Sequence, residues 1–88
     1  MRLVFSTQAA AEYRAWRARD PATLARLDAL IGASLQDPFE GTGKPEALRG
    51  RLSGWWSRRI VGEHRLVYRV TGKGEAQALE IAQCRYHR

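Results

Sequence analysis

Hydrophobic residues recur at helical spacing through the first part of the chain. Ala9, Tyr13 and Trp16 lie three or four positions apart, which predicts a first helix. A second helix is expected between Asp20-Pro21, which has the residue types of a helix cap and a first helical position, and Asp37-Pro38. The two helices are predicted to form a hairpin with one apolar side.

The pattern changes after the second helix. Glycine and proline break any regular spacing over residues 38–50, which are expected to form an ordered loop. Three strands are expected further along, at residues 52–61, 65–70 and 76–86. Turn-like residues separate them, so they should pair as an antiparallel meander. With a short strand at residues 2–5, this order predicts one α+β domain over residues 1–88, in which the helix hairpin covers one face of a small antiparallel sheet.

The net charge of +6 is unevenly distributed along the chain. Residues 1–40 contain five Arg and five Asp or Glu, so the whole positive excess lies in residues 41–88. This asymmetry indicates a face that binds a polyanion, because neutralising phosphate groups releases counterions. A solvated basic surface without a partner is the alternative.

Cysteine content and hydropathy narrow the class of protein. A single cysteine, Cys84, excludes an internal disulfide and a cysteine-based metal cage, and its simplest role is that of a small buried residue. The apolar run near Met1 is too short for a signal peptide, and no stretch is long enough to span a bilayer. A cytoplasmic protein without a cofactor or metal site is therefore expected.

A glutamate, an arginine and a histidine are expected near one open sheet face. Strand alternation places Arg65 opposite its apolar neighbours, and a last strand reaching residue 86 would direct Arg85 and His87 the same way. Glu46 lies in the adjoining loop. Metal-independent RNA cleavage requires a base for the ribose 2′-hydroxyl, a cation for the phosphoryl oxygens and an acid for the leaving 5′-oxygen, and Glu46, Arg65 and His87 suit these roles in that order. The expected products are a 2′,3′-cyclic phosphate and a 5′-hydroxyl.

Each of these residues also has an ordinary interpretation. Glu46 in a glycine- and proline-rich loop is by default a solvated surface residue, and Arg65 pairs with an acid or lies in water. His87 lies near the end of the chain, where functional roles are uncommon. His64 is the competing histidine, and as a turn residue it is more often structural. Of the adjacent tryptophans 55 and 56, one should be in the core, while the other stacks on a base or packs on a neighbour.

Four segments resemble motifs of the YoeB-type toxins of the RelE superfamily. They occur in the family's order and with near-identical spacing, and they cover about half of the chain. The segments are DPFEGTGKPE at residues 37–46, LSGWWSRRI at 52–60, EHRLVY at 63–68 and CRYH at 84–87.

The resemblance implies a RelE-like fold and the toxin role of a type II toxin–antitoxin system. It implies an endoribonuclease that cuts mRNA in the ribosomal A site and a cognate antitoxin of the YefM type that inhibits it. Carried over position by position, it implies that Glu46 is the base, Arg65 the phosphate-binding cation and His87 the acid. It further implies RNA contacts at Lys44, Arg49, Arg58, Arg59 and Arg85.

One position departs from the family pattern. Arg88 stands where such toxins usually have an aromatic residue after the histidine, and its guanidinium is expected to bind RNA by stacking or by charge. Two rival functions stay open: a basic module that binds RNA without cutting it, and a transcriptional co-repressor that acts with the antitoxin. Codon preference and oligomeric state, a homodimer included, also stay open.

Overall fold

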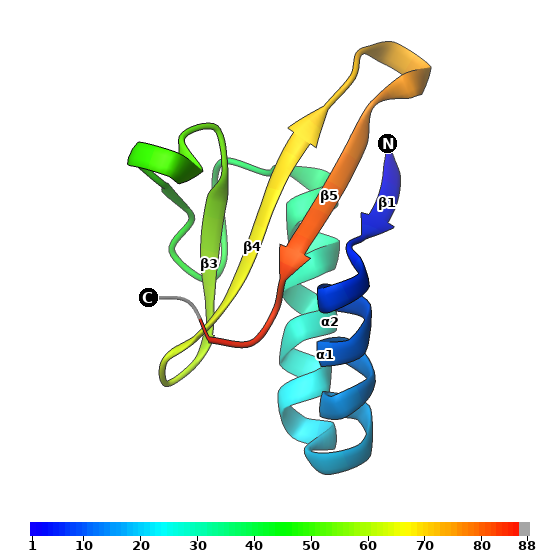
Figure 1. Ribbon diagram of the computed structural model, residues 1–88, viewed down its shortest axis with the longest axis vertical. Coiled ribbons are helices and arrows are strands. Elements are labelled where there is room, and N and C mark those ends of the chain that lie inside the picture. The colour runs from blue at the N-terminus through cyan, green and yellow to red at the C-terminus, as the bar shows by residue number, and fades with distance from the viewer. Residues whose placement is uncertain (87–88) are drawn as a thin grey trace.

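The computed structural model describes residues 1–86, which form two layers (Figure 1). A five-stranded sheet makes one layer, and a helix hairpin packed on one of its faces makes the other. The elements are β1 (Arg2–Phe5), α1 (Thr7–Arg19), α2 (Pro21–Gln36), β2 (Glu46–Ala47), β3 (Trp56–Val61), β4 (His64–Thr71) and β5 (Ala78–Gln83), with short 3-10 turns at Gly50–Leu52 and Gly74–Ala76. The α+β class predicted from the sequence is confirmed.

Side-chain hydrogen bonds cap the start of each helix, and the cap predicted at Asp20 is confirmed. The Ser6 hydroxyl accepts a hydrogen bond from the Ala9 N–H at the start of α1. Asp20 ends α1 and begins α2, where its carboxylate accepts from both the N–H and the hydroxyl of Thr23. These bonds satisfy N–H groups that have no partner inside the helix, and they hold the Asp20 pKa below its ordinary value.

The sheet has the strand order β1-β5-β4-β3-β2. Strands β2 to β5 pair antiparallel, as predicted, but β1 pairs parallel with β5. The sequence predicted a small antiparallel sheet, and the structure adds one parallel pair at this edge. Strand alternation specifies which side chains share a face, but it carries no information on the direction of a partner far away in the sequence.

Two predicted strands differ from the observed ones in length. The strand expected from residue 52 begins at Trp56, because a 3-10 turn occupies Gly50–Leu52. The last strand ends at Gln83 instead of residue 86. Side chains of α1 bind the backbone N–H and C=O of Cys84, so these groups are not available to the sheet.

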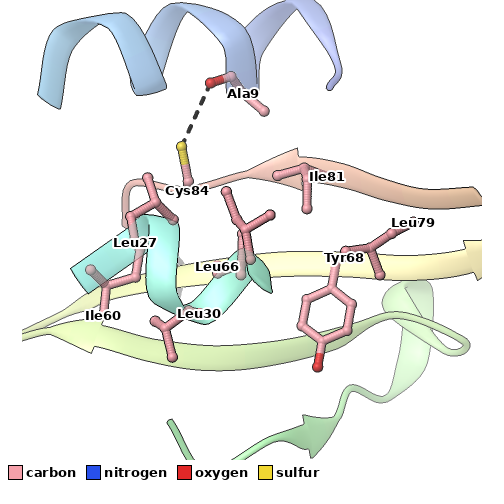
Figure 2. Close-up of a cluster of buried hydrophobic side chains, with 10 residues drawn as sticks. Ala9, Leu27, Leu30, Ile60, Leu66, Tyr68, Leu79, Ile81 and Cys84 are labelled. Carbon is pink, nitrogen blue, oxygen red and sulfur yellow. Dashed lines mark hydrogen bonds between the residues drawn. The ribbon is translucent and has the colours of Figure 1, made fainter. Parts of the chain in front are cut away.

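The core lies between the sheet and the helix hairpin. Leu27 and Leu30 of α2 meet Leu66 of β4 and Leu79 of β5, and all four side chains are fully buried (Figure 2). Burial of such a side chain contributes roughly 1.5–3 kcal/mol. Cys84 is also fully buried, as predicted, with its Sγ directed at the Ala9 carbonyl oxygen in Figure 2. Among the described residues, no helix is long and apolar enough to cross a membrane.

Candidate nucleic-acid interface

The sheet face opposite the helices, called the outer face here, carries a row of paired residues across four strands. Glu46 of β2 pairs with Ser57 of β3, Ser57 pairs with Val67 of β4, and Val67 pairs with Gln83 of β5 across a shift in register. Directly paired residues point to the same side of a sheet, with Cβ atoms about 4.5–5.5 Å apart. The structure thus places Glu46 on the outer face, at the edge strand.

Two arginines lie beside this row on the outer face. Arg59 of β3 and Arg65 of β4 are directly paired, two residues along from Ser57 and Val67. The Arg59 side chain is exposed, and the Nη1 of Arg65 donates to the carbonyl oxygens of Gly62 at 2.8 Å and His64 at 3.0 Å. Like charges directly opposite one another are destabilising, and an anion between the two guanidinium groups relieves that repulsion. This pair is suited to bind a phosphate.

Arg58, which was expected to contact RNA, lies in the interior instead. Its side chain is fully buried on the helix side of β3, paired with Leu66. The guanidinium donates to the Tyr68 hydroxyl at 3.0 Å, to the carbonyl oxygens of Thr42 and Glu40, each at 2.9 Å, and to that of Asp37. Because adjacent strand residues face opposite sides, Arg58 and Arg59 cannot both reach the outer face. Arg58 holds the loop at residues 37–42 against the sheet.

The residue that follows this loop, Gly43, is also bound to β3. The carbonyl oxygen of Gly43 accepts the Arg59 N–H at 2.7 Å, and Gly43 has a φ of +89°. A Cβ added at Gly43 would lie 2.7 Å from the Cδ2 of Leu30, so only glycine fits without movement. Since the loop is fixed here, the exposed Lys44 and Glu46 that follow are delivered to the edge of the outer face.

The two tryptophans divide between the faces, as the sequence predicts. Trp56 packs against the core, with its ring centroid 4.9 Å from that of Phe39. Trp55 instead lies under the Arg69 guanidinium, whose carbon is 4.5 Å from the indole centroid. Arg69 also forms an ion pair with Glu80 at 2.8 Å, and this hydrogen bond, followed by one from Thr71, lowers the Glu80 pKa. Trp55 therefore packs on a neighbour.

The remaining predicted site residues lie around the outer face or beyond the described chain. Arg49 is exposed in the segment after β2, and Arg85 is half-buried after β5, with its guanidinium 5.4 Å from the Tyr86 ring centroid. His87 and Arg88 lie outside the described residues. Among residues 1–86, no three His, Cys, Asp or Glu side chains are grouped so that they could hold a metal ion.

Three side chains that contact the backbone of Cys84 and Tyr86 were not predicted from the sequence to be functional. Glu12 and Trp16 of α1 bind the backbone of Cys84, and His64 binds the backbone of Tyr86. The spacing of Glu12 and Trp16 places them on one helix face, but nothing local indicates which segment that face meets. His64 was interpreted as structural, and it makes contacts of that kind here.

The fold is that of a bacterial toxin. A YoeB/ParE toxin from Agrobacterium tumefaciens superposes with a TM-score of 0.95 at 44% identity, with 100% of both chains covered. The chain belongs to the family of YoeB-like toxins of bacterial type II toxin–antitoxin systems, whose family model matches residues 5–88. Toxin YoeB of Escherichia coli (strain K12) is 46% identical over 87 residues, which is 99% of each chain.

The chain is also similar to the toxin in a solved toxin–antitoxin complex. A chain of the heterotetrameric YoeB-YefM complex from Staphylococcus aureus is 36% identical, with a TM-score of 0.87 and coverage of 100% of this chain and 98% of that one. The RelE-like fold and the toxin family predicted from the four sequence motifs are both confirmed.

Proposed function

We propose that this toxin is a ribosome-dependent endoribonuclease that inhibits translation in the cytoplasm by cutting mRNA in the A site. The observation that carries the proposal is the placement of Glu46, Arg59 and Arg65 on one sheet face, on three neighbouring strands. A domain that only binds RNA has little use for a carboxylate on a basic face. A carboxylate beside two cations is suited to act as the base for an RNA hydroxyl, because the cations can bind the neighbouring phosphate.

The proposed reaction is a transesterification at the ribose. The Glu46 carboxylate takes the proton of the 2′-hydroxyl, and the 2′-oxygen forms a bond to phosphorus. Arg65, with Arg59 opposite it, stabilises the charge on the non-bridging oxygens. The bond from phosphorus to the 5′-oxygen breaks, and His87 supplies the proton to that leaving oxygen. The products are a 2′,3′-cyclic phosphate and a 5′-hydroxyl, and the chain's own side chains complete the reaction without a metal ion.

The role of His87 is supported by the sequence motif and by the course of the chain before it. After β5, which lies between β1 and β4, the chain runs towards the turn between β3 and β4 (Figure 1). There the Tyr86 ring contacts that of His64, the residue next to Arg65, with ring centroids 4.3 Å apart and planes tilted by 47°. The described segment therefore ends one residue before His87, beside the strand that carries the proposed phosphate-binding arginine.

The proposed partners follow from the family and from charge. The Staphylococcus aureus complex contains YoeB with YefM, so we propose a YefM-type antitoxin for this toxin. An acidic segment that is disordered when free and folds on binding suits a chain of net charge +6. The exposed Lys44, Arg49 and Arg59 are proposed to contact RNA on the ribosome, together with Arg85 and Arg88.

The test is cleavage of mRNA on programmed ribosomes in single-turnover assays. We expect 5′-hydroxyl and cyclic phosphate ends, and cleavage that persists when free divalent metal is lowered without disrupting the ribosomes. Glu46→Gln, Arg65→Ala and His87→Ala should each slow cleavage by about 100-fold or more, since general acid–base groups and groups that stabilise transition-state charge each contribute on that order. Glu75→Gln, an exposed carboxylate between β4 and β5, is the matched control and should cut normally.

Three outcomes would contradict the proposal. A 5′-phosphate product would exclude attack by the 2′-oxygen. Full activity of Glu46→Gln would mean that another group acts as the base. Binding to ribosomes with intact mRNA would favour the non-catalytic RNA-binding module.

A further inference from the structure

We propose that His64, with Glu12 and Trp16, forms an anchor that positions the C-terminal segment and with it the acid of the reaction. This inference rests on the function proposed above. None of the three residues is assigned to contact RNA. They act on the reaction through the backbone of Cys84 and Tyr86.

The first half of the anchor binds both backbone groups of Cys84. The Glu12 Oε1 accepts the Cys84 N–H at 2.8 Å, and the Trp16 Nε1 donates to the Cys84 carbonyl oxygen at 2.9 Å. Glu12 and Trp16 are four residues apart, so both lie on the same face of α1. The Cys84 side chain is fully buried and belongs to the core. The chain after β5 is therefore held against α1 instead of continuing along the sheet.

The second half of the anchor holds Tyr86. The His64 Nδ1 accepts the Tyr86 N–H at 3.1 Å, and the two rings lie 4.3 Å apart between centroids. Trp16 approaches the imidazole edge-on at 90°, with centroids 4.7 Å apart. The imidazole thus lies between α1 and the C-terminal segment. In this contact Nδ1 acts as the hydrogen-bond acceptor.

The backbone of Tyr86 adopts an unfavourable conformation at this contact. Tyr86 has a φ of +48°, a left-handed conformation that is costly for an aromatic residue and persists only when its surroundings enforce it. The Gln83 side chain donates a further hydrogen bond to the Tyr86 carbonyl oxygen. Side chains therefore bind both polar backbone groups of Tyr86, the residue that precedes His87 in the sequence.

The contacts of the His64 imidazole also indicate that His64 and His87 have different roles. The Nδ1 of His64 is taken by a backbone amide, and its ring contacts Trp16 and Tyr86. A group held this way is suited to positioning. We accordingly assign His64 as a positioning residue and keep His87 as the proposed acid.

The experiment compares His64→Ala with His64→Asn, because the asparagine Oδ1 can accept a hydrogen bond where Nδ1 does. Hydrogen exchange of the Tyr86 amide is measured together with cleavage on programmed ribosomes over a range of ribosome concentrations. In His64→Ala we expect the Tyr86 amide to exchange about tenfold faster, as loss of one hydrogen bond implies. The cleavage rate at saturation should fall about tenfold, with the half-saturating ribosome concentration nearly unchanged. His64→Asn should restore most of both.

Folding is checked in the same samples through the protection of the Leu66 and Leu79 amides in the core. An unchanged Tyr86 exchange rate in His64→Ala would overturn the anchor while leaving the proposed function intact. A His64→Asn variant with restored protection but slow cleavage would show that the imidazole takes part in the chemistry, which also overturns it. A wild-type protein that cuts no RNA would sink the proposed function, whereas Tyr86 exchange would still decide whether His64 holds the segment.

Discussion

At the scale of single residues, burial gives Cys84 a chemistry different from that of a surface thiol. Desolvation, with the nearby Glu12 carboxylate as a second cause, raises the pKa of Cys84 to about 12. The thiolate is therefore disfavoured in the folded state at every physiological pH. Cys84 acts as a small apolar residue that fills the space under α1.

This shift predicts a pH dependence of stability. The folded pKa is above the unfolded value, so the stabilisation is fully present below the unfolded pKa of about 8.5 and is lost as the pH rises towards 12. Between pH 8.5 and 10, the free energy of unfolding should fall more steeply in the wild type than in Cys84→Ala. The extra slope is at most about 1.4 kcal/mol per pH unit. Urea denaturation at a series of pH values measures it, and parallel curves for the two proteins would contradict the shift.

At the scale of elements, the loop at residues 37–42 is attached to the sheet by the buried Arg58 guanidinium, which binds no carboxylate among residues 1–86. Carbonyl oxygens and the Tyr68 hydroxyl compensate Arg58 instead. The Tyr68 hydroxyl in turn donates to the Pro38 carbonyl oxygen. Loss of the guanidinium leaves several acceptors unsatisfied in the interior, and each such group is costly.

Arg58→Met should therefore destabilise the protein strongly. The methionine keeps much of the apolar stem, so the loss is mainly that of hydrogen bonds, on the order of 3 kcal/mol or more. In a domain of this size, such a change lowers Tm by roughly 10 °C or more. Arg59→Met, on the exposed side of the same strand, is the matched control and should change stability by no more than about 0.5 kcal/mol. Equal melting temperatures for the two variants would rule out this role for Arg58.

Local signals in the sequence predict the elements well and their long-range partners poorly. Ser6 and Asp20 mark helix starts by their own chemistry, so the hairpin could be predicted. Strand alternation explains why Arg59 points outward and Arg58 inward. The sequence therefore already indicated that only one of these two adjacent arginines could lie on the outer face. The end of β5 could not be found this way, because it depends on Glu12, which is 72 residues from Cys84.

At the scale of the whole molecule, the charge distribution predicts how partners associate. A chain of net charge +6, with its excess in residues 41–88, should attract an acidic antitoxin segment at long range. The association rate constant should fall about tenfold or more between low and physiological salt, while the dissociation rate changes less. Stopped-flow mixing with the antitoxin measures both rates.

The location of the charge also matters for this association. Arg59→Gln, on the outer face, should slow association more than Lys73→Gln, which removes an equal charge between β4 and β5. An association rate independent of salt would argue against electrostatic attraction. Equal effects of the two substitutions would instead place the antitoxin contact away from the outer face.

The parallel pairing of β1 with β5 affects how the protein can fold during its synthesis. Arg2 pairs with Ala78, so the edge of the sheet closes between segments separated by almost the whole chain. Contacts this distant in sequence form late, because the intervening loop must close first. While the chain is being translated, the apolar β1 has no partner until β5 has left the exit tunnel. A nascent toxin therefore cannot complete its sheet until β5 has emerged from the ribosome.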